Sequence, residues 1–437
     1  QLRPADRTAG LARAISARVY YGWFVAIAAG AAEFGNAASS ITVLTFFVIP
    51  MTDEFGWSRT EISGATSVGA ILGAALAPFT GRMVDRVGSR MVLVVGGVAV
   101  AAACFYLAAA QTLVGFYVAF TIARTADQGL IKIGTTPVVT KWFRRYRGRA
   151  VSVVFFTGML GVITMAPVVQ LVIAAWGWRA AWVMLGVVMA LVGVLPSALI
   201  VRRQPEDIGL RVDGASLYEA QGLPAADASV PGQASLDLDP RWRLGQILRT
   251  PAFWLLLVSL FVVSTASSGV VLHLMPYITE RGISSGSAVG IISVFTASGA
   301  VSTVAVGVLS DRTPPRLLMV VGYLLSASAM GMLIVTDTLP EAFLFAVLQG
   351  TAASGINVLA PILLASYYGR WAMGSIYGIT RAAQVVGFAL GALISGVVYD
   401  STGSYRDAFT LFLVIAVASS LLVIIAKRPA QPDAGTV

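Results

Sequence analysis

The 437-residue chain has little charge, one cysteine and one histidine. Charged residues make up 12% of it and hydrophobic residues 57%, whereas a soluble domain has roughly 25% charged residues. A single core cannot hide so much apolar surface from water, so we expect a lipid bilayer to be the solvent. The one cysteine, Cys104, lies in an apolar segment and has no partner for an intrachain disulfide.

The sequence also lacks the motifs of several kinds of chemistry. It has no GxxxxGK[ST] loop for the phosphates of ATP, and no cluster of Cys and His residues with metal-ligand spacing. No nucleophile stands beside a base. These absences argue against an ATP-driven pump, an enzyme, a metal site and a bound cofactor. Ion gradients remain as the source of energy.

Basic residues outnumber acidic ones, 30 to 21, and give a net charge of +9. If the N-terminus lies inside the cell, 23 of the 30 Lys and Arg residues fall in segments that face the cytoplasm. This distribution is the positive-inside bias that sets membrane topology, rather than a surface for nucleic acid. We therefore expect a multi-pass protein of the plasma (inner) membrane, with both termini in the cytoplasm and no nucleic-acid partner.

The apolar residues gather in twelve long segments. A bilayer core about 30 Å thick needs about 20 apolar residues of helix, and helices are the only open-chain structures that pair every backbone amide in lipid. We therefore predict an all-α membrane protein with twelve transmembrane helices in two pseudo-symmetric six-helix halves. The predicted spans are roughly residues 21–48, 62–80, 90–110, 113–138, 149–174, 180–200, 253–278, 286–308, 317–336, 343–366, 373–398 and 406–426.

Residues 201–250 interrupt this pattern. They include Pro205, Pro224 and Pro231 and several acids, without a long apolar run, which is typical of a flexible linker. We predict an N-terminal half at residues 1–200, a cytoplasmic linker at 201–250 and a C-terminal half at 251–437. The end of the linker, residues 241–248, is predicted to form a short helix on the membrane surface.

Glycine is abundant, with 44 residues. Gly387 and Gly391 form a GxxxG pair, and Gly158 and Gly161 lie in the middle of the fifth predicted span. Because small residues let helix backbones approach closely in membranes, we predict helix packing at these positions. The bending that a moving transporter needs is a compatible second role.

One short charged motif occurs twice between apolar segments, as Gly81-Arg82-Met83-Val84-Asp85-Arg86-Val87-Gly88-Ser89-Arg90 and as Gly307-Val308-Leu309-Ser310-Asp311-Arg312-Thr313-Pro314-Pro315-Arg316. The copies are 226 residues apart, from Asp85 to Asp311. This spacing indicates a duplicated membrane unit. Parallel repeats of this kind build one large class of secondary transporters.

The paired GxxxDRxGxR-like loops resemble the signature of the major facilitator superfamily. Further stretches are similar to its monocarboxylate porter and oxalate–formate antiporter branch: Phe55-Gly56-Trp57-Ser58-Arg59, Lys141-Trp142-Phe143 with Arg147-Gly148-Arg149-Ala150, Gly177-Trp178-Arg179, Arg203-Gln204-Pro205-Glu206-Asp207-Ile208-Gly209-Leu210, His273-Leu274-Met275-Pro276-Tyr277 and Tyr399-Asp400-Ser401-Thr402-Gly403-Ser404-Tyr405. The resemblance covers nearly the whole chain outside the linker and tails. It implies the twelve-helix fold of that superfamily.

The resemblance also implies a role for the charged loops. Asp85 and Arg86, with Asp311 and Arg312, would form interhelical contacts at the cytoplasmic helix ends and hold the outward-open state. A carboxylate beside a helix N-terminus gains from the helix dipole, which agrees with gating. The alternative is a purely structural turn whose arginines set the topology.

Ionisable and polar side chains also lie deep in the predicted spans, where they are expensive and each suggests a functional site. Four groups stand out: Glu33 with Asn36 on the first span, Arg124 with Asp127 on the fourth, Asn357 on the tenth, and Tyr377, Arg381 and Gln384 on the eleventh. The spacing of Arg124 and Asp127 lets them pair. The last three residues follow i, i+4, i+7 spacing and predict one polar stripe.

Arg381 is the first candidate for substrate binding. A buried guanidinium needs an anion or a cluster of carbonyls, and its planar fork matches a carboxylate. In the oxalate–formate branch a basic residue of the eleventh helix contacts the anionic substrate, so the resemblance implies that role. The alternative is a salt bridge from Arg381 to Glu33 or Asp127.

Arg124 and Asp127 have two interpretations. They could form a purely structural pair, or an anionic substrate could compete with Asp127 for Arg124. The competition would loosen the hold on Asp127, favour its protonation and couple substrate to proton. Glu33 is a second proton candidate, because a poorly solvated carboxylate without a nearby cation keeps its proton more readily.

Two further residues are considered. The only histidine, His273, lies near the outer end of the seventh span and could relay protons or simply form a local hydrogen bond. Lys132 is expected to reach the cytoplasmic interface by snorkelling rather than to serve the site.

We therefore expect a monomeric secondary active transporter for a small organic anion, a carboxylate, that works by alternating access with proton symport. Asn36, Asn357, Tyr377 and Gln384 would join the two arginines in binding the substrate. Anion exchange is the second possibility. A proton-coupled exporter of organic cations or drugs, using Glu33 and Asp127 as cation sites, and a membrane sensor without net flux are the rivals.

Overall fold

The computed structural model describes residues 19–214, 241–281 and 285–430, so Pro224, Pro231 and most of the predicted linker lie outside the described residues. The described chain divides into two compact units. Unit 1 contains the residues up to Arg241 together with Gly369–Gly378, and unit 2 contains Trp242–Tyr368 and the residues from Ile379 onward. The prediction of two halves joined by a linker stays a prediction.

Unit 1 begins with a broken helix in place of the first predicted span. It is made of α2 (Gly22–Gly35), the 3₁₀ turn η1 (Asn36–Ser39) and α3 (Ile41–Phe55). The Ser40 hydroxyl caps α3 by accepting a hydrogen bond from the backbone of Thr42. The break therefore places Asn36 in a turn at the middle of the span.

The next helices are α4 (Arg59–Val87) and α5 (Ser89–Ala109). A capping box of Ser58 and Glu61 starts α4. Gly88 separates the two helices with a φ of 99°, a conformation that favours glycine. The charged loop of the first motif is therefore a one-residue corner.

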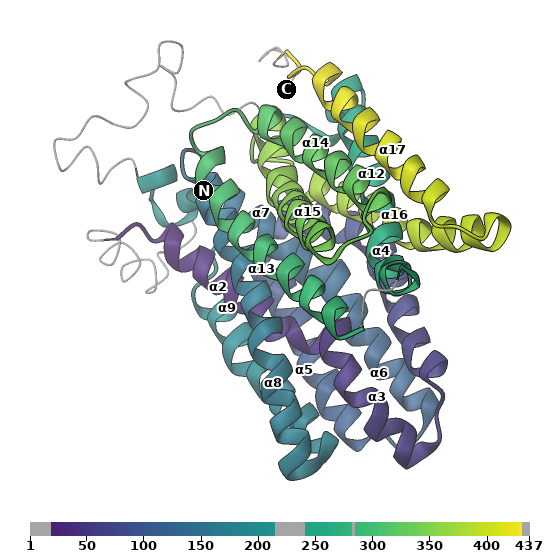
Figure 1. Cartoon of the computed structure of the whole chain (residues 1–437). Helices are drawn as coiled ribbons and strands as arrows, with labels where there is room; N and C mark the ends of the chain where they lie inside the picture. The colour runs from purple at the N-terminus through teal and green to yellow at the C-terminus, as the bar shows by residue number, and fades with distance from the viewer. Residues whose placement is uncertain (1–18, 215–240, 282–284, 431–437) are drawn as a thin grey trace. The chain divides into compact units, whose positions relative to one another are not determined.

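The fourth predicted span is α6 (Leu113–Ala126), the π-helical turn η2 (Asp127–Ile131) and α7 (Lys132–Trp142). The fifth and sixth spans form one helical run, α8 (Arg147–Val188), η3 (Met189–Val194) and α9 (Leu195–Leu199), bent at Gly177 with a φ of 83°. Figure 1 shows α5 packed between α6 and α8, with α2 along α8. Two short turns, η4 (Pro205–Ile208) and η5 (Val212–Gly214), follow.

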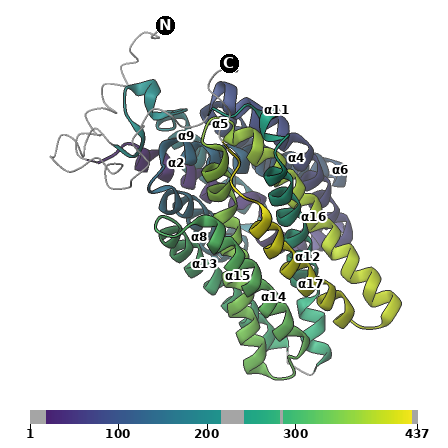
Figure 2. The ribbon, with the colours of Figure 1, turned by 90° about the horizontal axis from the view of Figure 1, so that it is seen from above.

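The remaining helices are α11 (Leu244–Ile247), α12 (Pro251–Glu280), α13 (Ser285–Ser310), α14 (Pro315–Ile334), α15 (Leu339–Tyr368), α16 (Met373–Thr402) and α17 (Arg406–Ile425). In unit 2, α15 packs beside α13 and α14 (Figure 2). The first residues of α16 belong to unit 1. The short helix α11 falls within the surface helix predicted at residues 241–248.

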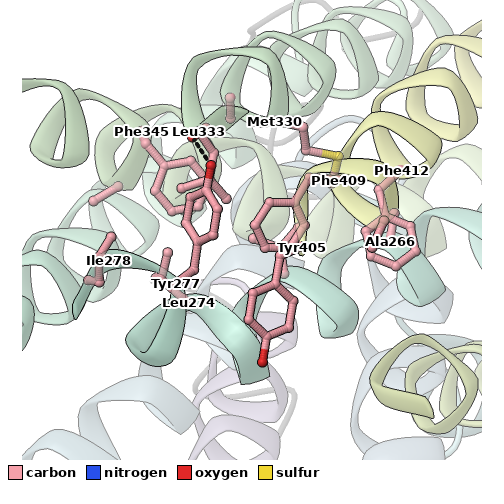
Figure 3. Packing of buried hydrophobic residues seen from close by; sticks show 14 of the residues in the cluster. Ala266, Leu274, Tyr277, Ile278, Met330, Leu333, Phe345, Tyr405, Phe409 and Phe412 are labelled. Atoms are coloured by element: carbon pink, nitrogen blue, oxygen red, sulfur yellow. Dashed lines mark hydrogen bonds between the residues drawn. The ribbon is translucent and has the colours of Figure 1, made fainter. Parts of the chain in front are cut away.

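The core of unit 2 is built mostly from aromatic and aliphatic side chains of α12, α14, α15 and α17 (Figure 3). Tyr277 packs edge-on against Phe409, with ring centroids 4.9 Å apart. Its hydroxyl donates to the Leu333 carbonyl at 3.0 Å, so the buried ring keeps a partner for its polar end.

Glycines let helices approach closely within each unit. A Cβ on Gly161 would lie 2.6 Å from the Phe34 carbonyl oxygen of α2. In unit 2, a Cβ on Gly387 or on Gly391 would meet the backbone carbonyls of Phe261 and Thr265 on α12. The predicted packing role of these glycines is confirmed.

Within the described ranges, ten helices are long and apolar enough to cross a membrane. The run from Arg147 to Leu199 counts once among the ten but holds the fifth and sixth predicted spans. The α6–η2–α7 segment is not among them, because its polar side chains interrupt the apolar sequence. Every predicted span therefore corresponds to a described helical segment.

Candidate functional site

Asp127 is the centre of a polar cluster inside unit 1. Its side chain is only 3% exposed, and Arg124 Nη1 donates to Asp127 Oδ2 at 2.7 Å. Asn36 Nδ2 donates to Oδ1 at 2.6 Å, and Gln128 Nε2 donates to Oδ2 at 2.8 Å. Three donors thus compensate the buried carboxylate. The predicted pairing of Arg124 with Asp127 is confirmed, and Asn36 joins it from η1.

Arg124 links this cluster to the broken first helix. Its Nη1 also donates to the Ser39 carbonyl at 3.1 Å. Its Nε is buried and has no hydrogen-bond partner among the described residues. The guanidinium therefore keeps one donor that neither Asp127 nor the backbone satisfies.

Glu33 and Lys132 form a second ion pair beside the first. Lys132 Nζ donates to Glu33 Oε2 at 3.1 Å and lies 3.7 Å from Asp127 Oδ1. The Thr135 hydroxyl donates to Glu33 Oε1 at 2.8 Å. Two expectations are wrong: Glu33 does have a close cation, and Lys132 ends at this carboxylate instead of snorkelling to the interface. We call Glu33, Asn36, Arg124, Asp127, Gln128, Lys132 and Thr135 the charge network.

The π turn η2 explains why Asp127 and Lys132 share a side of the helix. In a regular α-helix, residues i and i+5 point about 140° apart, because each residue turns by about 100°. Here the Lys132 backbone N–H bonds to the Asp127 carbonyl, the i+5 bond of a π turn. The wider turn brings Lys132 around toward Asp127 and Glu33.

The predicted polar stripe of α16 is divided between the two units: Tyr377 belongs to unit 1, and Arg381 and Gln384 belong to unit 2. Tyr377, in unit 1, accepts a 3.5 Å contact from the Thr136 hydroxyl of α7. In unit 2, Arg381 Nη1 lies 3.4 Å from Gln384 Oε1, a long hydrogen bond. The Arg381 Nε is buried and has no partner in the described parts of the chain. Arg381 is therefore a half-buried cation with donors to spare.

Asn357 and His273, both in unit 2, use their polar groups locally. Asn357 is exposed, and its Nδ2 donates to the Ala353 carbonyl of its own helix at 3.0 Å. His273 Nε2 lies 3.2 Å from the Ala392 carbonyl, and Nδ1 lies 3.2 Å from the Tyr405 hydroxyl. A carbonyl only accepts, so Nε2 carries a hydrogen. Both ring nitrogens are engaged, which favours the local hydrogen-bond alternative for His273.

Asp85, in the last turn of α4, joins that helix to the start of α16 within unit 1. Its carboxylate accepts from the backbone N–H groups of Gly374 at 2.9 Å and Ser375 at 2.7 Å. The Ser375 hydroxyl, at 2.7 Å, and Lys141 Nζ, at 3.2 Å, complete its four donors. This geometry places a carboxylate on the positive end of a helix dipole. Arg86, next to it, is exposed.

The first linker residues cover the same end of unit 1. Arg203 Nη2 donates to the Asp85 carbonyl at 2.7 Å, and Arg370 Nη2 pairs with Glu206 Oε1 at 2.6 Å. The Asp213 carboxylate accepts from the backbone N–H of Arg145 at 2.8 Å. These contacts fasten the described start of the linker to α4, to the 369–378 segment and to the turn before α8.

The second copy of the motif lies in the turn between α13 and α14 in unit 2. Asp311 is half-buried there and Arg312 is exposed. The Arg312 backbone N–H donates to the Leu309 carbonyl at 3.0 Å. In the ranges that the structure describes, no group of His, Cys, Asp and Glu residues could hold a metal ion.

Reasoning from the sequence missed Gln128, Thr135 and the pairing of Lys132. Gln128 is adjacent to Asp127, and Thr135 follows Lys132 at helical spacing, so both could have been proposed as neighbours. The π turn left no signal in the sequence that periodicity could detect.

Comparisons with known proteins agree on one family. The family model described as Major Facilitator Superfamily matches residues 25–339 and 285–436. The chain is 24% identical to the oxalate:formate antiporter of Oxalobacter formigenes over 242 residues, which are 55% of this chain and 52% of that protein. It is 24% identical to monocarboxylate transporter 11 of Mus musculus over 404 residues, 89% of this chain and 83% of that protein.

Solved structures show the same fold. The human organic anion transporter MFSD10 (TETRAN) aligns with a TM-score of 0.69 at 17% identity, over 92% of this chain and 99% of that chain. FucP, a Major Facilitator Superfamily transporter in the outward conformation, aligns with a TM-score of 0.69 at 12% identity, over 95% and 100%. The predicted all-α, twelve-helix fold class is confirmed.

Proposed function

Because this chain belongs to the Major Facilitator Superfamily, whose relatives here are membrane transporters and not enzymes, we propose that it carries a small organic anion by alternating access, together with a proton. The anion is a carboxylate, whose two oxygens match the planar fork of a guanidinium. The names of its relatives, which include an oxalate:formate antiporter and monocarboxylate transporters, support this class of substrate.

The charge balance of the network is the observation that carries the proposal. Glu33 and Asp127 are each paired with a cation, Lys132 and Arg124, so the four charges sum to zero. Arg381 of unit 2 is outside this count. Within the network itself, adding an anion alone would leave one uncompensated charge where charge is expensive. Adding an anion with a proton keeps the sum at zero. The network therefore favours symport.

We assign roles on this basis. Arg124 and Arg381 bind the carboxylate through the donors that their protein neighbours leave unsatisfied, and Asn36, Tyr377, Gln384 and Asn357 supply polar contacts around it. Glu33 or Asp127 accepts the proton. His273, with both ring nitrogens engaged, has the weakest support as a proton relay.

Gating completes the proposal. Asp85 holds the N-terminus of α16, and release of its four hydrogen bonds would accompany opening at that end; Arg86, Asp311 and Arg312 would serve the same transition. We propose that these loops and both termini lie in the cytoplasm, as the positive-inside bias favours, and that the chain acts as a monomer in the plasma membrane.

The test is transport by the purified chain in liposomes. We expect uptake of radiolabelled lactate, formate or oxalate, faster with acid outside and abolished by a protonophore. Uptake that requires a carboxylate on the opposite side, and ignores the pH gradient, would identify an exchanger. Transport of organic cations alone would overturn the proposal, and the absence of any flux would identify a sensor.

A further inference from the structure

We propose that Lys132 is the ammonium that receives the substrate carboxylate, and that Glu33 is the internal carboxylate which the substrate displaces. Glu33 takes up the proton when it leaves Lys132, and Thr135 positions it. This inference rests on the proposed function, since it names the residues that exchange anion and proton.

Accessibility singles out Lys132 within the network. Its side chain is 30% exposed, whereas those of Glu33, Arg124 and Asp127 are 10%, 14% and 3% exposed. Of the four charged side chains, Lys132 is therefore the most accessible to an anion that reaches this part of unit 1. Lysine is a flexible point charge that can change partners without matching a fixed fork.

The number of hydrogen bonds decides which carboxylate yields. Asp127 accepts from Arg124, Asn36 and Gln128 at 2.6 to 2.8 Å. Glu33 accepts only from Lys132 at 3.1 Å and Thr135 at 2.8 Å in the described structure. Moving Lys132 away from Glu33 breaks one bond of 3.1 Å, whereas Asp127 is held by three bonds of 2.6 to 2.8 Å. Asp127 Oδ1, 3.7 Å from Lys132 Nζ in this structure, is a second carboxylate near the ammonium.

The surroundings of Glu33 make it the proton acceptor once the ammonium has turned away. From α7 it faces Lys132 and Thr135, and beyond Lys132 lies Asp127 of η2. From α8 it faces Gly158, which brings no charge. Neither η3 nor α9 contains an ionisable residue. A carboxylate left there without a cation favours its protonated form.

The step balances in charge and atoms. A hydronium ion gives one proton to Glu33 Oε2 and becomes water, while Lys132 stays protonated and pairs with the incoming carboxylate. One anion and one proton enter, and the network remains neutral. We expect the Thr135 hydroxyl to stay within hydrogen-bond distance of Glu33 Oε1 in the ionised and the protonated state, so the carboxyl group keeps its position.

The experiment uses the full chain in liposomes with radiolabelled lactate, formate and oxalate. Glu33→Gln mimics the protonated acid. We expect it to retain exchange of internal for external label near the wild-type rate, while accumulation driven by the pH gradient falls by about 5-fold to 150-fold, the range of typical coupling energies. Glu54→Gln, which breaks an exposed pair with Arg179 in the same unit, is the matched control and should retain accumulation.

Lys132→Ala should weaken binding of the same anion by about 30-fold or more, and Lys132→Arg should recover part of it. If Lys132→Ala fails to fold because Glu33 is left unpaired, the neutral double variant Glu33→Gln/Lys132→Met replaces it. That variant should fold and bind the anion about 30-fold or more weakly than the wild type.

Thr135→Val tests positioning. Loss of a bond to the carboxylate form favours protonation of Glu33, so half-maximal uptake should move to higher pH. Thr140→Val, on the same helix and equally buried, donates only to the Pro137 carbonyl and should leave the profile unchanged.

Proton-driven accumulation in Glu33→Gln, or full anion affinity in Lys132→Ala or the double variant, would overturn the inference while leaving the proposed function standing. Loss of accumulation in Asp127→Asn but not in Glu33→Gln would move the proton to Asp127. A wild-type protein that carries no anion would end both proposals.

Discussion

At the scale of single residues, the largest structural demand falls on Asp127. Its carboxylate is 3% exposed and compensates a guanidinium that is 14% exposed. Removing one partner of a buried ion pair leaves an uncompensated charge, at a cost of about 3–5 kcal/mol. Asp127, Arg124, Asn36 and Gln128 are therefore held together more tightly than the members of an exposed ion pair.

We therefore expect Asp127→Ala to lower the free energy of unfolding by about 3–5 kcal/mol, measured by denaturant titration in mixed micelles. The double variant Asp127→Ala/Arg124→Met should recover much of the loss, because it removes the stranded cation. Glu54→Ala breaks a pair whose members are 39% and 42% exposed and should change stability little. An equal loss of unfolding free energy in Asp127→Ala and Glu54→Ala would mean that burial does not determine how much the Asp127 ion pair stabilises the fold.

The Arg381 guanidinium has an N–H donor that no described residue accepts from, and we propose that the substrate carboxylate accepts it. Truncating Arg381 would therefore remove a contact to the substrate. We expect Arg381→Ala to abolish binding of the transported carboxylate and Arg381→Lys to retain part of it, because a lysine keeps the charge but loses the planar fork. Equilibrium binding of labelled anion to purified protein measures both. Arg406→Ala, at the exposed start of α17, is the control. Unchanged affinity in Arg381→Ala would remove Arg381 from the site.

Residue types and their depth in the apolar spans singled out Glu33, Asn36, Arg124 and Asp127 in the sequence, and the structure brings these four residues into one polar cluster. The same reasoning failed for Lys132, because it treated the fourth span as a regular helix. A regular helix would point Lys132 away from Asp127, and snorkelling was then the reasonable alternative. The partner of Glu33 was missed for the same reason.

At the scale of elements, length and apolar composition predicted where helices run, and cap residues such as Ser58 with Glu61 explain where they begin. The turns η1 and η2 were not predicted. They fall where polar residues enter the apolar spans, at Asn36 and at Asp127 with Gln128, whereas the bend at Gly177 lies between the fifth and sixth predicted spans. Tertiary contacts accompany both turns, because Asn36 and Gln128 donate hydrogen bonds to the Asp127 carboxylate.

The close approach of α4 and the start of α16 is such a packing constraint. A Cβ on Gly81 would collide with the Gly374 carbonyl, and one on Gly374 would collide with the Gly81 carbonyl. We expect Gly81→Ala to separate these helices and weaken the four hydrogen bonds of Asp85. A cysteine introduced at position 375 (Ser375→Cys) should then react faster with a thiol reagent, and transport should slow.

Gly396→Ala is the control for that experiment. Gly396 lies on α16, as Ser375 does, and its Cβ would meet no atom within 4 Å. Unaltered accessibility at Ser375 in Gly81→Ala would show that the contact of α4 with α16 does not limit opening.

At the scale of the whole molecule, the repeated motif predicted a duplicated chain, and the family match agrees with it. The two copies nevertheless differ in local structure. Asp85 accepts four hydrogen bonds around the start of α16, whereas Asp311 lies in a turn between consecutive helices. Sequence similarity could not separate these roles, because the partners of Asp85 are far along the chain.

At the same scale, the proposed symport of one anion with one proton predicts the net charge that the transporter moves per cycle. A monocarboxylate that enters with one proton carries no net charge, so a membrane potential should not drive it. One uncompensated charge would respond by about 2.3 kcal/mol per 100 mV, roughly a 50-fold change in accumulation. We expect lactate uptake at a fixed pH gradient to be insensitive to a potassium diffusion potential, while oxalate with one proton should respond to it. A strong voltage response for lactate would show that proton and anion do not enter one for one, and that the balance between Glu33 and Lys132 does not set the stoichiometry.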